Sequence, residues 1–152
     1  MQLNRRFIFG LLALALTAVA AAQEKPAEKK SEPRTLKVKV NYTGSGQVDA
    51  KHPIFVFVFD TPVFSENAMP IGAGTTAAKD GTVTITDLSA SPVYVVAAYD
   101  PQGAYDGQSG PPPSGSSMGV YSKNPPEPEP VKIEPGATVQ IELPFDDSAK
   151  MP

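Results

Sequence analysis

Residues 81–100 read GTVTITDLSASPVYVVAAYD, and this stretch decides the fold class. Its first part alternates Val83 and Ile85 with threonines, a period of two that predicts a half-buried strand. A turn rich in Ser and Pro follows at 89–92, and the apolar run at 93–100 predicts a second strand. Short strands separated by turns, without a helical period, are typical of an all-β protein.

The same kind of pattern extends from this stretch in both directions. Residues 35–42 (TLKVKVNY) and 139–145 (VQIELPF) alternate between apolar and other residues, which predicts strands with one buried face. Residues 54–60 (IFVFVFD) are apolar on both faces, which predicts a central strand that is covered on both sides or lies at a sandwich core. Shorter strands are expected at 71–77 and 131–134. About seven strands of this kind predict an antiparallel β-sandwich of the transthyretin-like (prealbumin-like) or Ig-like type.

The N-terminal residues have the three parts of a secretory signal peptide. Arg5 and Arg6 supply the positive charge, residues 7–19 are apolar, and three alanines precede Gln23 as a cleavage signal. The apolar run is too short to span a membrane comfortably, because about 20 residues are needed. We expect cleavage before Gln23 and export by a bacterial Sec-type route to the periplasm or the cell exterior. The alternative is an uncleaved anchor helix.

Four segments follow from these patterns. We expect a signal peptide at 1–22, a flexible charged linker at 23–34, the β-sandwich domain at 35–146 and a polar tail at 147–152. The folded part, of roughly 110 residues, has the usual size of one domain.

Composition excludes several kinds of chemistry. The chain has no cysteine, so disulfides, thiolate zinc sites and cysteine nucleophiles are excluded. Its formal net charge is −3, and loss of Arg5 and Arg6 with the signal peptide makes the mature chain more acidic. A nucleic acid is therefore not an expected partner, because phosphate binding needs clustered basic side chains.

No familiar catalytic constellation is present in the sequence. His52 is the single histidine, and it precedes a proline at a strand start, a position typical of an exposed turn rather than of a Ser-His-Asp triad. The adjacent acids Asp146 and Asp147 point to opposite sides of an extended chain, which does not suit a glycosidase pair. We therefore predict that the protein is not an enzyme.

The loop after residue 100 offers a candidate calcium site. Asp100, Gln102 and Asp106 can supply oxygen ligands, and calcium takes six to eight of them. The alternative, which we favour, is that Asp100 and Asp106 accept hydrogen bonds from the backbone of their own loop, as strand-terminal aspartates commonly do.

Two tyrosines are candidate ligand-binding residues. Tyr105 lies in the long loop and Tyr121 follows it, where exposed rings can stack on a sugar or a peptide. The alternative is that both rings fold back and cover one end of the sandwich.

The order of strand, Asp-Leu, Ser/Pro turn and Tyr-Val-Val-Ala strand in residues 81–100 carries a family resemblance. With Asp106, the Pro-Gly segment at 111–115, Gly119 and Tyr121, it resembles carboxypeptidase-regulatory-like and transthyretin-like domains, and it is similar to a bacterial family of uncharacterised exported domains. The resemblance implies a prealbumin-like sandwich. Transthyretin-like hydroxyisourate hydrolases use several histidines and a C-terminal Tyr-Arg motif, and both are missing here.

Together these observations predict an exported, non-enzymatic β-sandwich module with a structural or binding role. Its expected partner is an envelope protein or a glycan. A calcium-stabilised carbohydrate-binding or adhesion module is the alternative.

Overall fold

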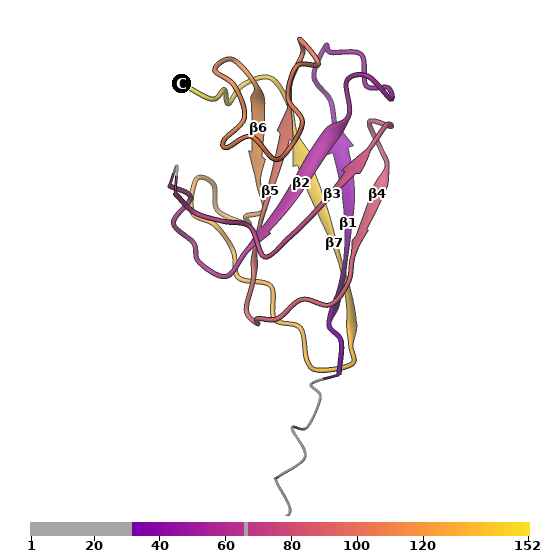
Figure 1. Ribbon diagram of the computed structural model, residues 1–152, viewed down its shortest axis with the longest axis vertical. Coiled ribbons are helices and arrows are strands. Elements are labelled where there is room, and N and C mark those ends of the chain that lie inside the picture. Colours follow the sequence, from indigo (N-terminus) through magenta and orange to yellow (C-terminus); the bar gives the residue numbers. More distant parts are fainter. Residues whose placement is uncertain (1–31, 66) are drawn as a thin grey trace, which may run out of the picture.

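The computed structural model describes residues 32–65 and 67–152, and these form an all-β, sandwich-like fold (Figure 1). The expected signal peptide and most of the expected linker lie outside the described residues. The strands are β1 (Thr35–Tyr42), β2 (Ile54–Phe59), β3 (Gly72–Thr76), β4 (Thr82–Ile85), β5 (Tyr94–Tyr99), β6 (Ser117–Val120) and β7 (Thr138–Phe145). Sheet A has the order β4-β1-β7 and sheet B the order β3-β2-β5-β6. Within the described ranges, no helix is long and apolar enough to cross a membrane.

The main core lies between the two sheets. Alternate residues of β1 point into it, among them the fully buried Leu36, Val38 and Val40. Val56 and Val58 of β2 meet them from sheet B. Each such side chain stabilises the fold by about 1.5–3 kcal/mol relative to an exposed one, so the period of two in the sequence corresponds directly to this core.

Strand β2 is buried on both faces, as its sequence predicts. It lies in the interior of sheet B, between β3 and β5, and both directions along its pleat are apolar. Ile54, Val56 and Val58 enter the main core, whereas Phe55 and Phe57 form a second cluster on the outer face of sheet B with Ala98. The outer face of this sheet is therefore apolar.

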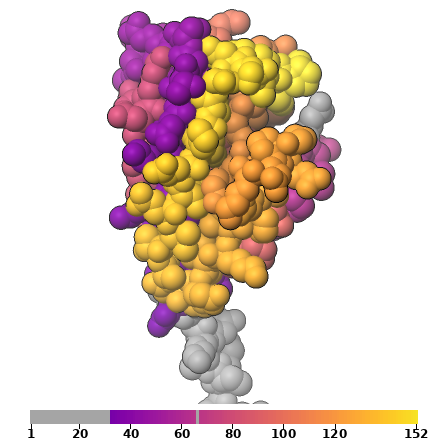
Figure 2. Space-filling view, turned by 180° about the vertical axis from the view of Figure 1, so that it is seen from behind, coloured from indigo at the N-terminus to yellow at the C-terminus, as the bar shows by residue number. Residues whose placement is uncertain are grey.

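One pair of strands departs from the expected antiparallel arrangement. β1 and β7 are parallel along their whole length, with Thr35 opposite Thr138 and Tyr42 opposite Phe145. The two strands lie side by side in indigo and yellow on the face of the molecule in Figure 2. A parallel pair needs a long crossover, and here the crossover is everything between the first and last strands.

The number of strands agrees with the prediction, but one of them is a different segment. The predicted strand at 131–134 is wrong: Val131 forms a single bridge with Val93, and the prolines at 130 and 135 limit further pairing. Instead, β6 forms inside the stretch that the sequence describes as a loop. It pairs antiparallel with β5 and becomes the fourth strand of sheet B.

The polar tail at 147–152 folds back onto β6. The backbone N–H of Met118 donates to Ala149 O at 2.9 Å, and the N–H of Met151 donates to Ser116 O at 2.8 Å. The tail therefore covers the outer edge of sheet B, which would otherwise present unpaired backbone groups.

Candidate functional site

The carboxylate of Asp100 is committed to its own loop. Asp100 is 4% exposed, and its oxygens accept the backbone N–H groups of Gln102 at 2.9 Å, Ala104 at 2.8 Å and Tyr105 at 3.0 Å. A buried carboxylate needs such partners. These bonds turn the chain back over sheet B directly after β5, which is the role that the sequence favours for this residue.

Asp106 closes a second turn in the same loop. It accepts the N–H groups of Gln108 and Ser109 at 2.8 and 2.9 Å, and the hydroxyl of Ser109. These donors, the hydroxyl first, lower the pKa of Asp106 to about 2. Among residues 32–65 and 67–152, no three His, Cys, Asp or Glu side chains come together as metal ligands, and the side chain of Gln102 is exposed. Calcium binding by Asp100, Gln102 and Asp106 remains a prediction without a gathered ligand set.

The structure separates the two candidate tyrosines. Tyr105 folds onto the outer face of sheet B, where its ring centroid lies 4.9 Å from that of Phe55 and 6.3 Å from that of Phe57. Its hydroxyl donates to Gly110 O at 2.8 Å. Tyr121 packs against the main core instead. Only Tyr105 of this pair therefore belongs to the outer-face cluster.

An apolar groove lies on the outer face of sheet B, with a volume of about 670 Å³. We call it the outer groove. Phe57, Phe59, Val96 and Met118 contribute from the strands, and Tyr105 from the β5–β6 loop. The remaining lining residues come from the β2–β3 loop, the β5–β6 loop and the tail: Phe64, Ser65, Ala68, Met69, Pro70, Gly107, Gln108, Gly110, Pro111, Pro112, Met151 and Pro152.

The β2–β3 loop presents apolar side chains to solvent beside this groove. Met69 is 80% exposed and Phe64 is 37% exposed, and the Phe64 ring centroid lies 5.2 Å from that of Phe59. Among the described lining residues, Ser65, Gln108 and Tyr105 carry polar side chains and no charged side chain occurs. Such a surface suits an apolar ligand better than a sugar, whose hydroxyl groups need polar partners.

A polar cluster around Asp147 joins the tail to β6, on the face of the strand opposite the outer groove. Asp147 accepts the hydroxyls of Tyr42 and Ser117, each at 2.6 Å, and the Ser45 N–H at 2.8 Å. Lys150 Nζ lies 2.7 Å from Ser117 Oγ and 3.2 Å from Asp147. These donors, Ser117 first, hold the pKa of Asp147 far below its usual range, while burial, followed by the bond to Asp147, raises the pKa of Tyr42 to about 12.

This polar cluster holds a serine and a lysine as a hydrolase would, but its serine is inaccessible. Ser117 is 0% exposed, and its hydroxyl donates to Asp147. A nucleophile must reach its substrate, so the cluster acts to fasten the tail and the β1–β2 loop to β6.

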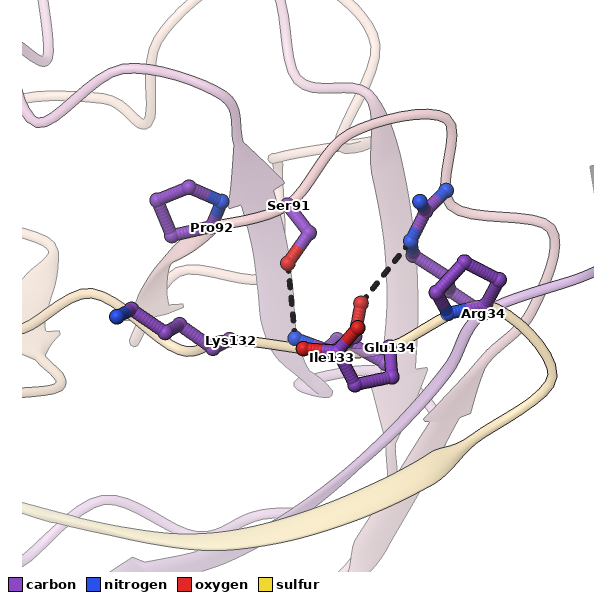
Figure 3. Close-up of a pocket in the computed structure, with 7 residues that line it drawn as sticks. Arg34, Ser91, Pro92, Lys132, Ile133 and Glu134 are labelled. Atoms are coloured by element: carbon purple, nitrogen blue, oxygen red, sulfur yellow. Dashed lines mark hydrogen bonds between the residues drawn. The ribbon is translucent and has the colours of Figure 1, made fainter.

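A smaller cavity of about 280 Å³ lies near the start of β1 (Figure 3). Arg34 Nε donates to Ile133 O at 3.0 Å, and the Ile133 N–H donates to Ser91 Oγ at 2.9 Å. These side chains satisfy the backbone of a segment that lacks strand partners. The contacts account for Arg34 and Ser91 as structural residues.

Comparisons of the chain with protein-family models, with curated proteins and with solved structures give no match. The resemblance to carboxypeptidase-regulatory-like domains stays a prediction.

Proposed function

We propose that this protein is an exported binding module without enzymatic activity, and that the outer groove is its ligand-binding site. The observation that carries the proposal is the groove itself, bordered by two loops and the tail on an apolar sheet face. Pockets that bury most of a small ligand have volumes of about 300–1,000 Å³ and are lined mainly by apolar side chains. The outer groove lies within this range and has this composition.

The methionines of the groove favour a binding role further. Met69, Met118 and Met151 all line it, and they come from a loop, a strand and the tail. Methionine is flexible and polarisable, and it is enriched on surfaces that adapt to apolar ligands. A surface with this composition can close around a ligand without a large change of the backbone.

Export is the part of the proposal that rests on the sequence. The positive, apolar and small-residue parts of 1–22 support it. Mass spectrometry of the protein recovered from the periplasm or the medium should give a mature chain that starts at Gln23. Recovery of the uncleaved chain from the membrane fraction would contradict export in a cleaved form.

The binding role can be tested with a neutral apolar fluorophore, N-phenyl-1-naphthylamine, titrated into the purified protein. Saturable fluorescence enhancement is expected. Met69→Gln should weaken binding roughly fivefold. The amide of Gln replaces the thioether and the terminal methyl group of Met69, so the ligand loses an apolar contact of about one or two methylene groups.

Val63→Gln is the matched control. Val63 belongs to the same loop and is 66% exposed, but it does not line the groove. This variant should bind the fluorophore as the original protein does. Equal weakening by both variants, or no saturable binding to the original protein, would overturn the assignment of the outer groove.

A further inference from the structure

A negative charge lies beside the outer groove, on a residue that is not itself part of the lining. Asp106 lies between Tyr105 and Gly107, which both line the groove, and its carboxylate is bonded to the N–H of Gln108, another lining residue. The side chain is exposed and its pKa is lowered to about 2, so it is ionised at neutral pH. A ligand in contact with Tyr105 or Gly107 therefore lies near this charge, whose attraction extends over about one Debye length (10 Å).

A basic residue beside the groove does not offset this charge. Lys150 precedes Met151, which lines the groove, but its Nζ is held by Ser117 and by the carboxylate of Asp147. Ser117 is fully buried in the polar cluster, whereas its neighbour Met118 packs with the outer-face aromatic cluster. Consecutive strand residues point to opposite faces, so Lys150 is turned away from the groove and paired.

Aromatic rings provide a second attraction for positive charge. Phe57, Phe59, Phe64 and Tyr105 line the groove, and their ring faces carry the negative part of the ring quadrupole. Ammonium groups bind such faces, and quaternary ammonium ions do so without losing a strong hydration shell. The rings and Asp106 therefore favour the same sign of charge.

We propose that the ligand of the outer groove is a small apolar cation, an aliphatic chain or ring system that carries one ammonium group. The proposal rests on the binding function proposed above and specifies the class of ligand. A volume of about 670 Å³ suits a small molecule. The described lining residues are uncharged, aromatic rings are among them, and Asp106 lies beside them, and this combination favours a cation over a fatty acid or another anion.

The test uses three molecules with the same decyl chain and different head groups. Decyltrimethylammonium, decanol and decyl sulfate compete with N-phenyl-1-naphthylamine for the purified protein, the two ionic compounds below their micelle concentrations and decanol below its solubility limit. The cation should displace the fluorophore at a concentration roughly fivefold below that of the alcohol, and decyl sulfate should be the weakest. Decanol reports apolar binding alone, whereas the ratio of cation to alcohol reports the charge preference.

Two variants test whether the preference for the cation comes from the charge of Asp106 and from the aromatic rings. Asp106→Asn keeps an acceptor for the turn but removes the charge, so it should reduce the ratio of cation to alcohol and leave decanol binding unchanged. Phe64→Leu keeps an apolar wall but removes a ring, and it should act in the same direction. Asp146→Asn is the matched control: Asp146 accepts the Ser148 N–H in a similar turn after β7, in the other sheet, and its loss should leave the ratio unchanged.

The outcomes separate the two proposals. Equal displacement by cation and alcohol, stronger displacement by decyl sulfate, or equal effects of Asp106→Asn and Asp146→Asn would overturn the cation proposal and leave apolar binding intact. Failure of all three decyl compounds to displace a bound fluorophore would overturn both. Sedimentation as a dimer, with the fluorophore excluded, would show that a second copy covers the groove and would also overturn the cation proposal.

Discussion

The carboxylate of Asp147 joins parts of the chain that are far apart in the sequence. It accepts bonds from Tyr42 at the end of β1, from Ser45 in the following loop and from Ser117 in β6. Bonds to a charged acceptor are stronger than neutral ones. One aspartate in a segment that the sequence describes as a polar tail therefore ties both sheets and the tail together.

The polar cluster around Asp147 should make the stability of the protein fall at both acid and alkaline pH. The pKa of Asp147 is lower in the folded chain than in the unfolded one, so its contribution is complete above about pH 4 and is lost as the pH falls further. The pKa of Tyr42 is raised to about 12, so its contribution is complete below about pH 10 and is lost as the pH rises from there toward 12.

Thermal melting across this pH range checks the expectation. Tyr42→Phe should lower the free energy of unfolding at neutral pH by about 1–2 kcal/mol, because it removes a hydrogen bond to a charged group. It should also reduce the loss of stability above about pH 10. An unchanged alkaline profile in this variant would contradict the role of the Tyr42 hydroxyl.

Calcium should not stabilise the protein through Asp100, because this residue has a structural role. Both of its oxygens already accept backbone N–H groups, and a calcium ion would have to replace these bonds. Millimolar calcium should therefore leave the melting temperature unchanged. A clear rise that Asp100→Asn abolishes would instead favour the calcium-binding alternative.

At the scale of elements, β6 depends on a close approach to sheet A. A Cβ atom at Gly119 would lie 2.5 Å from the Cβ of Phe145 in β7, well inside the normal contact distance. Gly119→Ala should therefore lower the free energy of unfolding by about 1–3 kcal/mol through overpacking. Val120→Ala, on the other face of the same strand, should cost less. Urea denaturation of both variants checks the order, and equal costs would contradict the close packing of β6 on β7.

The tail should protect the edge of β6 from solvent. Deletion of residues 149–152 removes the acceptors of the N–H groups of Gly115 and Met118. Hydrogen exchange at these two amides should become faster, while exchange at the centre of β2 stays slow because β2 has a strand on each side. Unchanged protection of both amides would show that the tail does not cover this edge.

The strands were predictable where local pattern and burial agree. Residues 35–42 alternate, and the observed β1 has the same bounds. β6 was not predictable, because a short segment with Gly119 at its centre has no period and forms only between β5 and the tail. The segment around Val131 is the opposite case. Its sequence is strand-like, but prolines on either side prevent a ladder of hydrogen bonds with another strand.

The candidate site could be predicted only in part. Tyr105 was identified as an exposed aromatic candidate, and the two-sided apolar run of β2 indicated that something must cover the outer face. The groove itself needs the β2–β3 loop, the β5–β6 loop and the tail to meet over sheet B. No local sequence pattern indicates that these segments come together. For the same reason, the sequence did not identify Met69 as a residue that lines the groove.

At the scale of the whole molecule, the two faces of sheet B should have different roles. Leu143 is fully buried in the main core, so Leu143→Ala should cost about 2–5 kcal/mol of stability. Phe59→Ala removes a partly exposed ring that lines the groove, so it should cost less stability but greatly weaken fluorophore binding. Denaturation and fluorophore titration of both variants check this difference. Equal losses of stability would show that the outer face is part of the structural core.

The parallel pairing of β1 with β7 has a consequence for the time at which the molecule folds. These strands lie about 100 residues apart in the sequence, and proteins dominated by such distant contacts fold slowly. Sheet A cannot be completed until β7 has been synthesised. Until then β1 has only β4 as a partner in sheet A, and the sheet lacks the strand that its longest ladder requires.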